Sequence, residues 1–114
     1  MKNYLARRGN VVYNEVMSTN ESINYAVADE TIKAAEVMIA ALQSMRTAGD
    51  INVQHWVAAD QIFRTAGRAA NLAMDTAEAA EKYDLSNAYE AASMRIGDAR
   101  GEVACELYHL RNAA

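Results

Sequence analysis

Apolar residues recur along the chain at the three- and four-residue spacing of α-helices, and short polar breaks divide them into four segments. We predict helices over four ranges, residues 2–17, 19–48, 53–83 and 84 or 86 to 112. Long helices joined by such short breaks pack as antiparallel neighbours. The pattern therefore predicts an all-α fold, a small antiparallel helical bundle with three long helices and a shorter N-terminal helix. The length of 114 residues indicates a single helical domain, 1–114.

Residues typical of helix ends mark two of the breaks. Ser18 and Glu21 have the spacing of a capping box, so the second helix is expected to start there. Gly49 is expected to end that helix, and Asp50 or Asn52 to cap the next one. The chain has no proline and only five glycines, too few for the turns of a β-sandwich or barrel.

The segment 19–48 carries two apolar stripes on different faces. The first consists of Ile23, Val27, Ala34, Met38, Ala41 and Met45, and the second of Ile32, Ala35, Ile39 and Leu42. Between Ala34 and Leu42 only Glu36 is polar. A helix that is apolar nearly all round is buried on several sides. This segment is therefore expected to be the central helix or to form a subunit interface.

The third segment carries a heptad seam that starts aromatic and ends in alanine. Its residues are Trp56, Phe63, Ala70 and Ala77 at one position and Ala59, Ala66, Ala73 and Ala80 at the other. Two helices that meet along such a seam come unusually close at the alanine end. In the last segment, Gly97 and Gly101 lie one turn apart on one side, which indicates a flat spot where another backbone comes close.

The charge is uneven along a chain whose formal net charge is −4. Lys2, Arg7 and Arg8 form a short basic arm, whereas residues 75–90 are acidic. Nucleic-acid binding is disfavoured, because domains that bind duplexes carry a basic stripe. The acidic run is either a solvated face or a surface on which a protein partner docks.

The environment of the chain is predicted from its single cysteine and from its hydropathy. Cys105 has no partner for an internal disulfide, which fits a reducing compartment. No stretch reaches the about 18 apolar residues needed to span a bilayer, and the N-terminus has no apolar signal core. We expect a cytoplasmic protein without membrane contact.

Two patterns offer metal chemistry as alternatives. Glu106 and His109 form a Glu-x-x-His, which in ferritin-like bundles places two ligands on one helix face, and Glu36 is the best candidate for an added inward carboxylate. The second such pair of a ferritin-like site is missing. Glu78 and Glu81 form a Glu-x-x-Glu, as in magnesium-dependent all-helical nucleotide pyrophosphohydrolases, but no Glu-x-x-Asp follows.

Without a catalytic constellation, the sequence favours a non-enzymatic protein that acts by protein–protein contact, needs no cofactor and forms a dimer. The expected self-association interface comprises Met38, Ile39, Leu42, Gly97 and Gly101. A narrower hypothesis is a small viral-type inhibitor that binds a host protein complex through its acidic surface. The expected partner-binding residues are Asp75, Glu78, Glu81, Asp84, Tyr13 and Tyr25.

Overall fold

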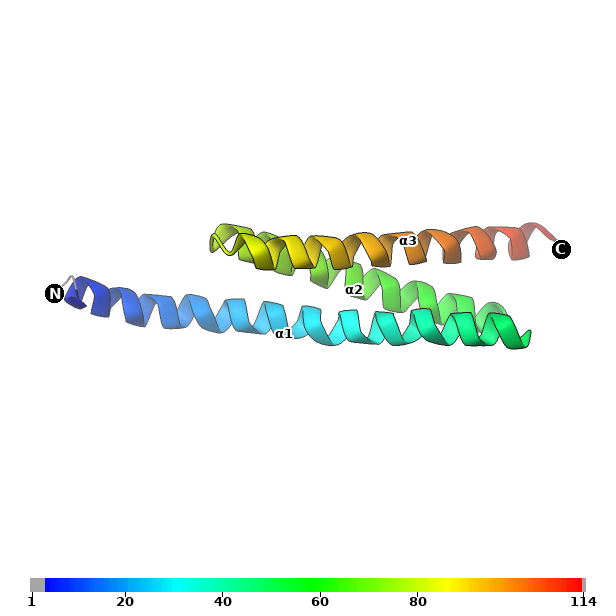
Figure 1. Cartoon of the computed structure of the whole chain (residues 1–114), viewed down its shortest axis with the longest axis horizontal. Helices are drawn as coiled ribbons and strands as arrows, with labels where there is room; N and C mark the ends of the chain where they lie inside the picture. The colour runs from blue at the N-terminus through cyan, green and yellow to red at the C-terminus, as the bar shows by residue number, and fades with distance from the viewer. Residues whose placement is uncertain (1–3, 114) are drawn as a thin grey trace.

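The protein is an elongated assembly of three helices. The computed structural model describes the backbone of residues 4–113 and the side chains of residues 19–113. Its helices are α1 (Tyr4–Ala48), α2 (Val53–Ala79) and α3 (Tyr83–Ala113), which form a rod of 70 × 20 × 19 Å. The all-α prediction is confirmed, since the described residues contain no strand. The chain turns back after α1 and again after α2, and the N-terminal part of α1 extends past the α2–α3 turn (Figure 1).

The predicted break after residue 17 is wrong, and a separate, shorter N-terminal helix is not confirmed. The helix α1 runs without interruption through Ser18 and Glu21. The Glu21 carboxylate does not cap a helix, because it accepts hydrogen bonds from Tyr25 and Lys82 instead. No glycine or proline occurs between Asn10 and Ala48 to end the helix.

The central helix is α2, so of the two roles expected for the segment 19–48 the central one is wrong, and the role as a subunit interface stays a prediction. The helix α2 packs along both α1 and α3, whereas α1 and α3 come close to each other at few positions. Its buried side is the heptad seam predicted from the sequence, and it comprises Trp56, Ala59, Phe63, Ala66, Ala70, Ala73 and Ala77. Most seam positions are alanines, and their short side chains let the neighbouring helices approach closely. Small side chains are therefore enough to fill the space between the helices along this part of the seam.

One group of large core side chains lies where the seam is aromatic. Phe63 is completely buried and clusters with Leu42 of α1 and with Ile96 and Val103 of α3. Trp56 closes this end, and the Arg46 guanidinium lies 5.2 Å from the centre of its ring. A cation over an indole face is stabilising, so Arg46 also links α1 to the start of α2.

The first turn follows the predicted capping chemistry. Gly49 has φ 75°, and the amide of Asp50 donates to the carbonyl of Met45 at 2.9 Å, as expected at a helix C-terminus. The Asn52 side chain accepts from the amides of Gln54 (2.9 Å) and His55 (3.3 Å). The His55 ring nitrogen Nδ1 in turn accepts from the amide of Asn52 at 3.0 Å, so a histidine completes this capping box.

The cap at Asn52 yields a first stability prediction. Replacing Asn52 by alanine leaves two amides at the start of α2 without their acceptor, and we expect the free energy of unfolding to fall by about 1 kcal/mol. Asn87→Ala, at an exposed position within α3, is the matched control. Urea unfolding followed by circular dichroism measures both, and equal losses for the two variants would contradict this role of Asn52.

The second turn comes earlier than predicted, because α2 ends at Ala79 rather than near residue 83. Glu81 takes a left-handed conformation with φ 60°, and its amide donates to the carbonyl of Glu78 at 2.9 Å. The amide of Lys82 donates to the carbonyl of Ala77 at 2.8 Å. A glutamate thus occupies the left-handed position at which glycine usually ends a helix, and no sequence signal marks it.

Candidate interaction surface

An exposed apolar stripe runs along α1 on the side turned away from the core. We call it the outer stripe, and it consists of Ile23, Val27, Ala34, Val37 and Ala41. Ile23 is 54% exposed, Val27 50% and Val37 66%. These positions are spaced by three, four or seven residues and so share one helix face, on which Glu30 lies between Val27 and Ala34. The stripe is about 27 Å long, because a helix rises about 1.5 Å per residue.

The other stripe of α1 faces the core. Ala28, Ala35 and Leu42 are buried, and Ile32 and Ile39 pack against the same cluster. Two apolar faces of one helix cannot both be covered when only α2 and α3 lie beside it. Of the first stripe predicted from the sequence, Ile23, Val27 and Ala34 are exposed, whereas Met38 and Met45 pack against the core. Val37, which neither predicted stripe included, is the most exposed valine or isoleucine of the outer stripe.

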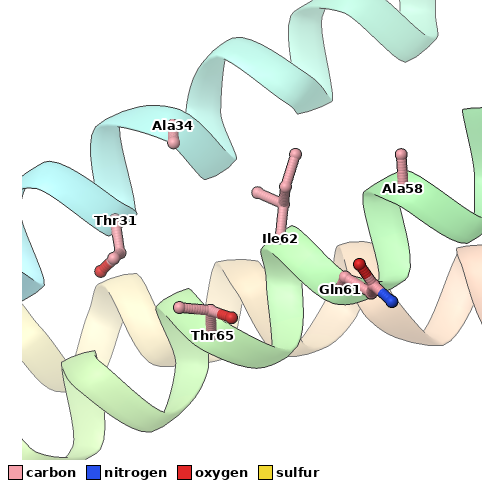
Figure 2. Close-up of a pocket in the computed structure, with 6 residues that line it drawn as sticks. All are labelled: Thr31, Ala34, Ala58, Gln61, Ile62 and Thr65. Atoms are coloured by element: carbon pink, nitrogen blue, oxygen red, sulfur yellow. The ribbon is translucent and has the colours of Figure 1, made fainter.

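The helix α2 widens this surface on one side. Two open hollows lie between α1 and α2, and both are lined by Ala34 and Ile62. In the first, of about 370 Å³, Ile62 stands between Thr31 and Ala58, while Gln61 and Thr65 continue the lining along α2 (Figure 2). We call the outer stripe and these α2 residues together the outer face.

The outer face has the chemistry of a protein contact rather than of a small-molecule site. The residues of the first hollow carry no charge, and their polar groups are limited to two hydroxyls and one amide. Pockets for small ligands enclose most of the ligand and fix it with a few convergent polar groups. A shallow, elongated apolar face is instead suited to an apolar stripe of another helix.

The predicted self-association residues fall into two places. Leu42 is buried in the core, and Met38 and Ile39 are half-buried against it. Met38 also lines the second hollow, so it alone of these three reaches the outer face. Gly97 and Gly101 lie on α3, and a Cβ added at either would meet nothing within 4 Å in the described part of the chain. Their predicted role as a flat spot for another backbone stays a prediction.

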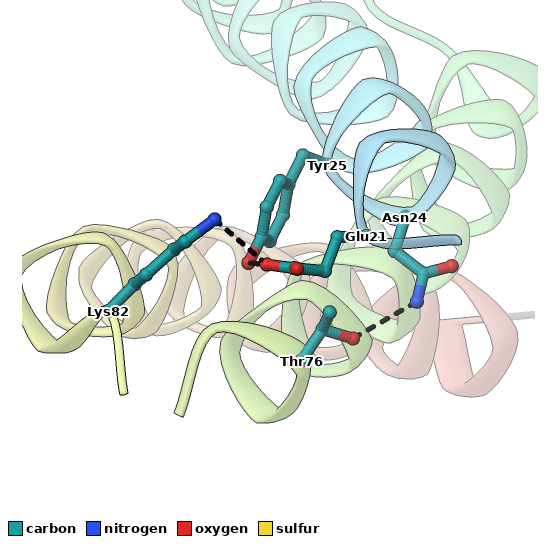
Figure 3. A network of polar contacts seen from close by, with 5 residues as sticks. All are labelled: Glu21, Asn24, Tyr25, Thr76 and Lys82. Atoms are coloured by element: carbon teal, nitrogen blue, oxygen red, sulfur yellow. Dashed lines mark hydrogen bonds and ion pairs between the residues drawn. The ribbon is translucent and has the colours of Figure 1, made fainter. Parts of the chain in front are cut away.

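A polar network ties the middle of α1 to the α2–α3 turn (Figure 3). The Glu21 carboxylate accepts from the Tyr25 hydroxyl at 2.9 Å and from Lys82 Nζ at 3.0 Å. Beside them, Asn24 Nδ2 donates to Thr76 Oγ1 at 3.0 Å. Residues before Glu21 thus lie beyond the end of the α2–α3 hairpin.

Two tyrosines pack between α1 and α3 at this network. The rings of Tyr25 and Tyr89 stack with 5.7 Å between their centres, and the Tyr89 hydroxyl donates to Asp29 at 2.9 Å. Burial, reinforced by Glu21, raises the pKa of Tyr25 to about 12. Burial likewise raises the pKa of Tyr89. Tyr25, predicted to contact a partner, is thus engaged inside the bundle.

The network makes stability depend on pH in a defined direction. The hydrogen bonds from Lys82 and Tyr25 hold the pKa of Glu21 below its ordinary value. A lowered pKa in the folded state contributes stability above the unfolded pKa of about 4.3, and this contribution disappears as the pH falls through the folded pKa. We expect Glu21→Gln to cost about 1 kcal/mol at neutral pH and progressively less below about pH 4.

Urea unfolding of Glu21→Gln and wild type at a series of pH values measures this difference. Glu102→Gln is the matched control, because Glu102 is exposed on α3 away from the network. A difference between Glu21→Gln and wild type that stays constant down to strong acid would rule out the ionic role of Glu21.

The acidic run lies at the α2–α3 end of the rod. Asp75, Glu78, Glu81 and Asp84 are all exposed, and no ion pair involves them among residues 19–113. Lys82, four residues after Glu78, forms its ion pair with Glu21 on α1. Docking of a partner on these four acids stays a prediction, and the side chain of Tyr13, also predicted to contact a partner, lies outside the described residues.

The residues of the ferritin-like alternative are not brought together. Glu36 is paired with Arg95 at 2.8 Å, and Glu106 lies 4.0 Å from Arg46. Because Glu36 and Arg46 both belong to α1, on the order of 15 Å of helix separates the two carboxylates. His109 is exposed, and its ring contacts only Tyr108 among the described aromatic residues. No group of three or more metal-binding side chains occurs among the described residues.

The pyrophosphohydrolase alternative also lacks its expected geometry. Glu78 belongs to α2, but Glu81 lies after the end of that helix in the left-handed turn position. The two carboxylates therefore do not share one helix face, which a Glu-x-x-Glu pair needs to hold magnesium together.

Within the described part of the chain, no helix is long and apolar enough to cross a membrane. Cys105 is exposed on α3 as a free thiol. The cytoplasmic location stays a prediction. No family model, curated protein or solved structure matches this chain, so a proposal for its function depends on the surface described above.

Proposed function

We propose that the protein is a non-enzymatic helical module that acts by binding a helix of a protein partner on its outer face. The observation that carries the proposal is the exposed outer stripe, above all Val27 and Val37, beside the uncharged hollow with α2. Single apolar residues scattered over a surface need no explanation, but several gathered along one helix face mark an interaction site, and here Glu30 alone interrupts them between Val27 and Ala34. The stripe lies on a helix that is already formed, and this keeps the entropic cost of binding low.

Photo-crosslinking tests the proposal. A photoreactive amino acid is placed at position 37, and at position 94 of α3 as the control, since Met94 is equally exposed at 65%. We expect protein adducts of defined mass from position 37 in extracts and with purified protein. An excess of unlabelled wild type suppresses them, whereas an excess of Val37→Glu does not. The proposal would lose its support if positions 37 and 94 gave the same adducts, or if an excess of unlabelled wild type did not reduce the adducts from position 37.

A further inference from the structure

The spacing of the outer-stripe residues is nearly the same when α1 is read from either end. Four of its five residues are placed symmetrically about position 32, with Ile23 and Ala41 at equal distances on the two sides, followed by Val27 and Val37. If a second α1 lies antiparallel across the first at this centre, Ile23 meets Ala41 of the other copy and Val27 meets Val37. Ala34, two residues after the centre, lies opposite Glu30 of the other copy.

The charges of this part of α1 divide in a way that fits the same arrangement. Residues 22–42 contain four charged side chains, of which Asp29 and Glu36 contact Tyr89 and Arg95 of α3. The other two, Glu30 and Lys33, are exposed, and neither forms an ion pair within the described residues. The bundle therefore leaves one acid within the outer stripe and one base beside it without an ion-pair partner among the described residues.

In the antiparallel arrangement these two charges meet their opposites. Positions 30 and 33 are also symmetric about the centre to within one residue, or about 1.5 Å along the axis. Glu30 lies within the stripe and Lys33 beside it on one flank, so in this arrangement Lys33 of each copy reaches toward Glu30 of the other. A twofold axis generates this contact twice, as in any isologous interface. A partner that repeats both the apolar spacing and the opposite charges is a second copy of this chain.

We propose that the outer face joins two copies of the chain through antiparallel α1 helices, with two symmetric ion pairs between Glu30 and Lys33. This rests on the proposed function and names its partner. The small side chains at Ala34 and Ala41 let the helices approach closely. On α2, Ala58, Gln61 and Thr65 widen the contact without adding charge.

The area of the outer face indicates how tightly two copies of the chain are expected to bind each other. A face about 27 Å long and two helices of about 10 Å wide covers about 540 Å² in projection. Stable interfaces bury about 800 Å² of accessible surface from each partner. The pair is therefore at the small end of specific interfaces, and we expect a dimer that dissociates on dilution.

Charge exchange between Glu30 and Lys33 tests the partner and the register together. In Glu30→Lys, like charges face each other at both contacts, and the same holds for Lys33→Glu. We expect each variant alone to dimerise about tenfold more weakly than wild type at low salt. Mixed together, the two variants restore both ion pairs and form a heterodimer in preference to either homodimer. The double variant Glu30→Lys/Lys33→Glu recovers the wild-type affinity.

Sedimentation equilibrium gives the masses, and circular dichroism shows that each variant is folded. Wild type that stays at 12.5 kDa at all concentrations would overturn the proposal. So would a dimer that single exchanges leave unchanged, or variants whose mixture is no tighter than its components. If such a result accompanied specific adducts of another protein at position 37, the proposed function would stand and only the identity of the partner would be wrong.

Discussion

Replacing Phe63 by alanine is expected to lower the free energy of unfolding by about 3–5 kcal/mol, the largest effect of any single substitution considered for this chain. Phe63 is 0% exposed and lies where all three helices contribute to the core. Its neighbours on the seam are alanines, whose side chains are too short to fill the space that the lost ring leaves. The cavity therefore stays open, and its cost adds to the lost burial.

Urea unfolding followed by circular dichroism measures the loss. Met94→Ala is the matched control, because Met94 is a large apolar residue on an exposed face of α3, and we expect it to change stability by less than about 0.5 kcal/mol. A loss at Phe63 as small as that at Met94 would show that the aromatic end of the seam is not the centre of the core.

Replacing Ala70 by leucine is expected to destabilise the protein by about 1–3 kcal/mol. Ala70 is fully buried in the alanine part of the seam, where α2 is packed on both sides. The added side chain has no cavity to enter, so it forces the neighbouring helices apart or takes a strained rotamer. Because leucine adds apolar surface, burial alone would predict a gain in stability. A loss of stability would instead show that close approach of the helices, rather than large side chains, holds the alanine end of the seam together.

The control is Ala91→Leu, at an exposed position of α3. The same change of residue is expected to be nearly neutral there, since leucine and alanine are both good helix formers. Thermal unfolding of both variants separates the two cases. If Ala70→Leu melted at or above the wild-type temperature, the seam would have space for a leucine side chain at position 70, and close packing there would be contradicted.

The sequence predicted those parts of the fold that depend on local or strictly periodic signals. The seam from Trp56 to Ala77 was visible because a buried face repeats every seven residues. The caps at Gly49 and Asn52 were visible because each acts on the backbone within a few residues. Where the signal is contained in neighbouring residues, prediction and structure agree.

The errors concern residues whose partners lie far along the chain. Glu21 has the spacing of a capping box, but Lys82 and Tyr25 use its carboxylate, and Lys82 is distant in sequence. The end of α2 was missed because Glu81 takes a conformation usually reserved for glycine. At Glu21 the local pattern was compatible with two structures and a contact distant in sequence selected one, whereas at Glu81 the bonds are local but the residue type gives no signal.

The candidate site was predicted in part for the same reason. Two apolar stripes on one helix indicated that one of them contacts something other than the core of the bundle. Which stripe faces inward depends on the positions of α2 and α3, and the sequence placed the interface on residues such as Leu42, which the structure buries. The self-matching of the outer stripe about position 32 is present in the sequence, but it gains meaning only when that face is known to be exposed.

The claim that two copies meet on the outer face is tested most directly by methyl NMR of valine-labelled protein over a dilution series from the millimolar to the micromolar range. We predict that the methyl signals of Val27 and Val37 shift together with concentration, whereas those of Val103, buried between α2 and α3, do not. Signals of Val27 and Val37 that stay fixed over the whole series, as Val103 should, would contradict the account.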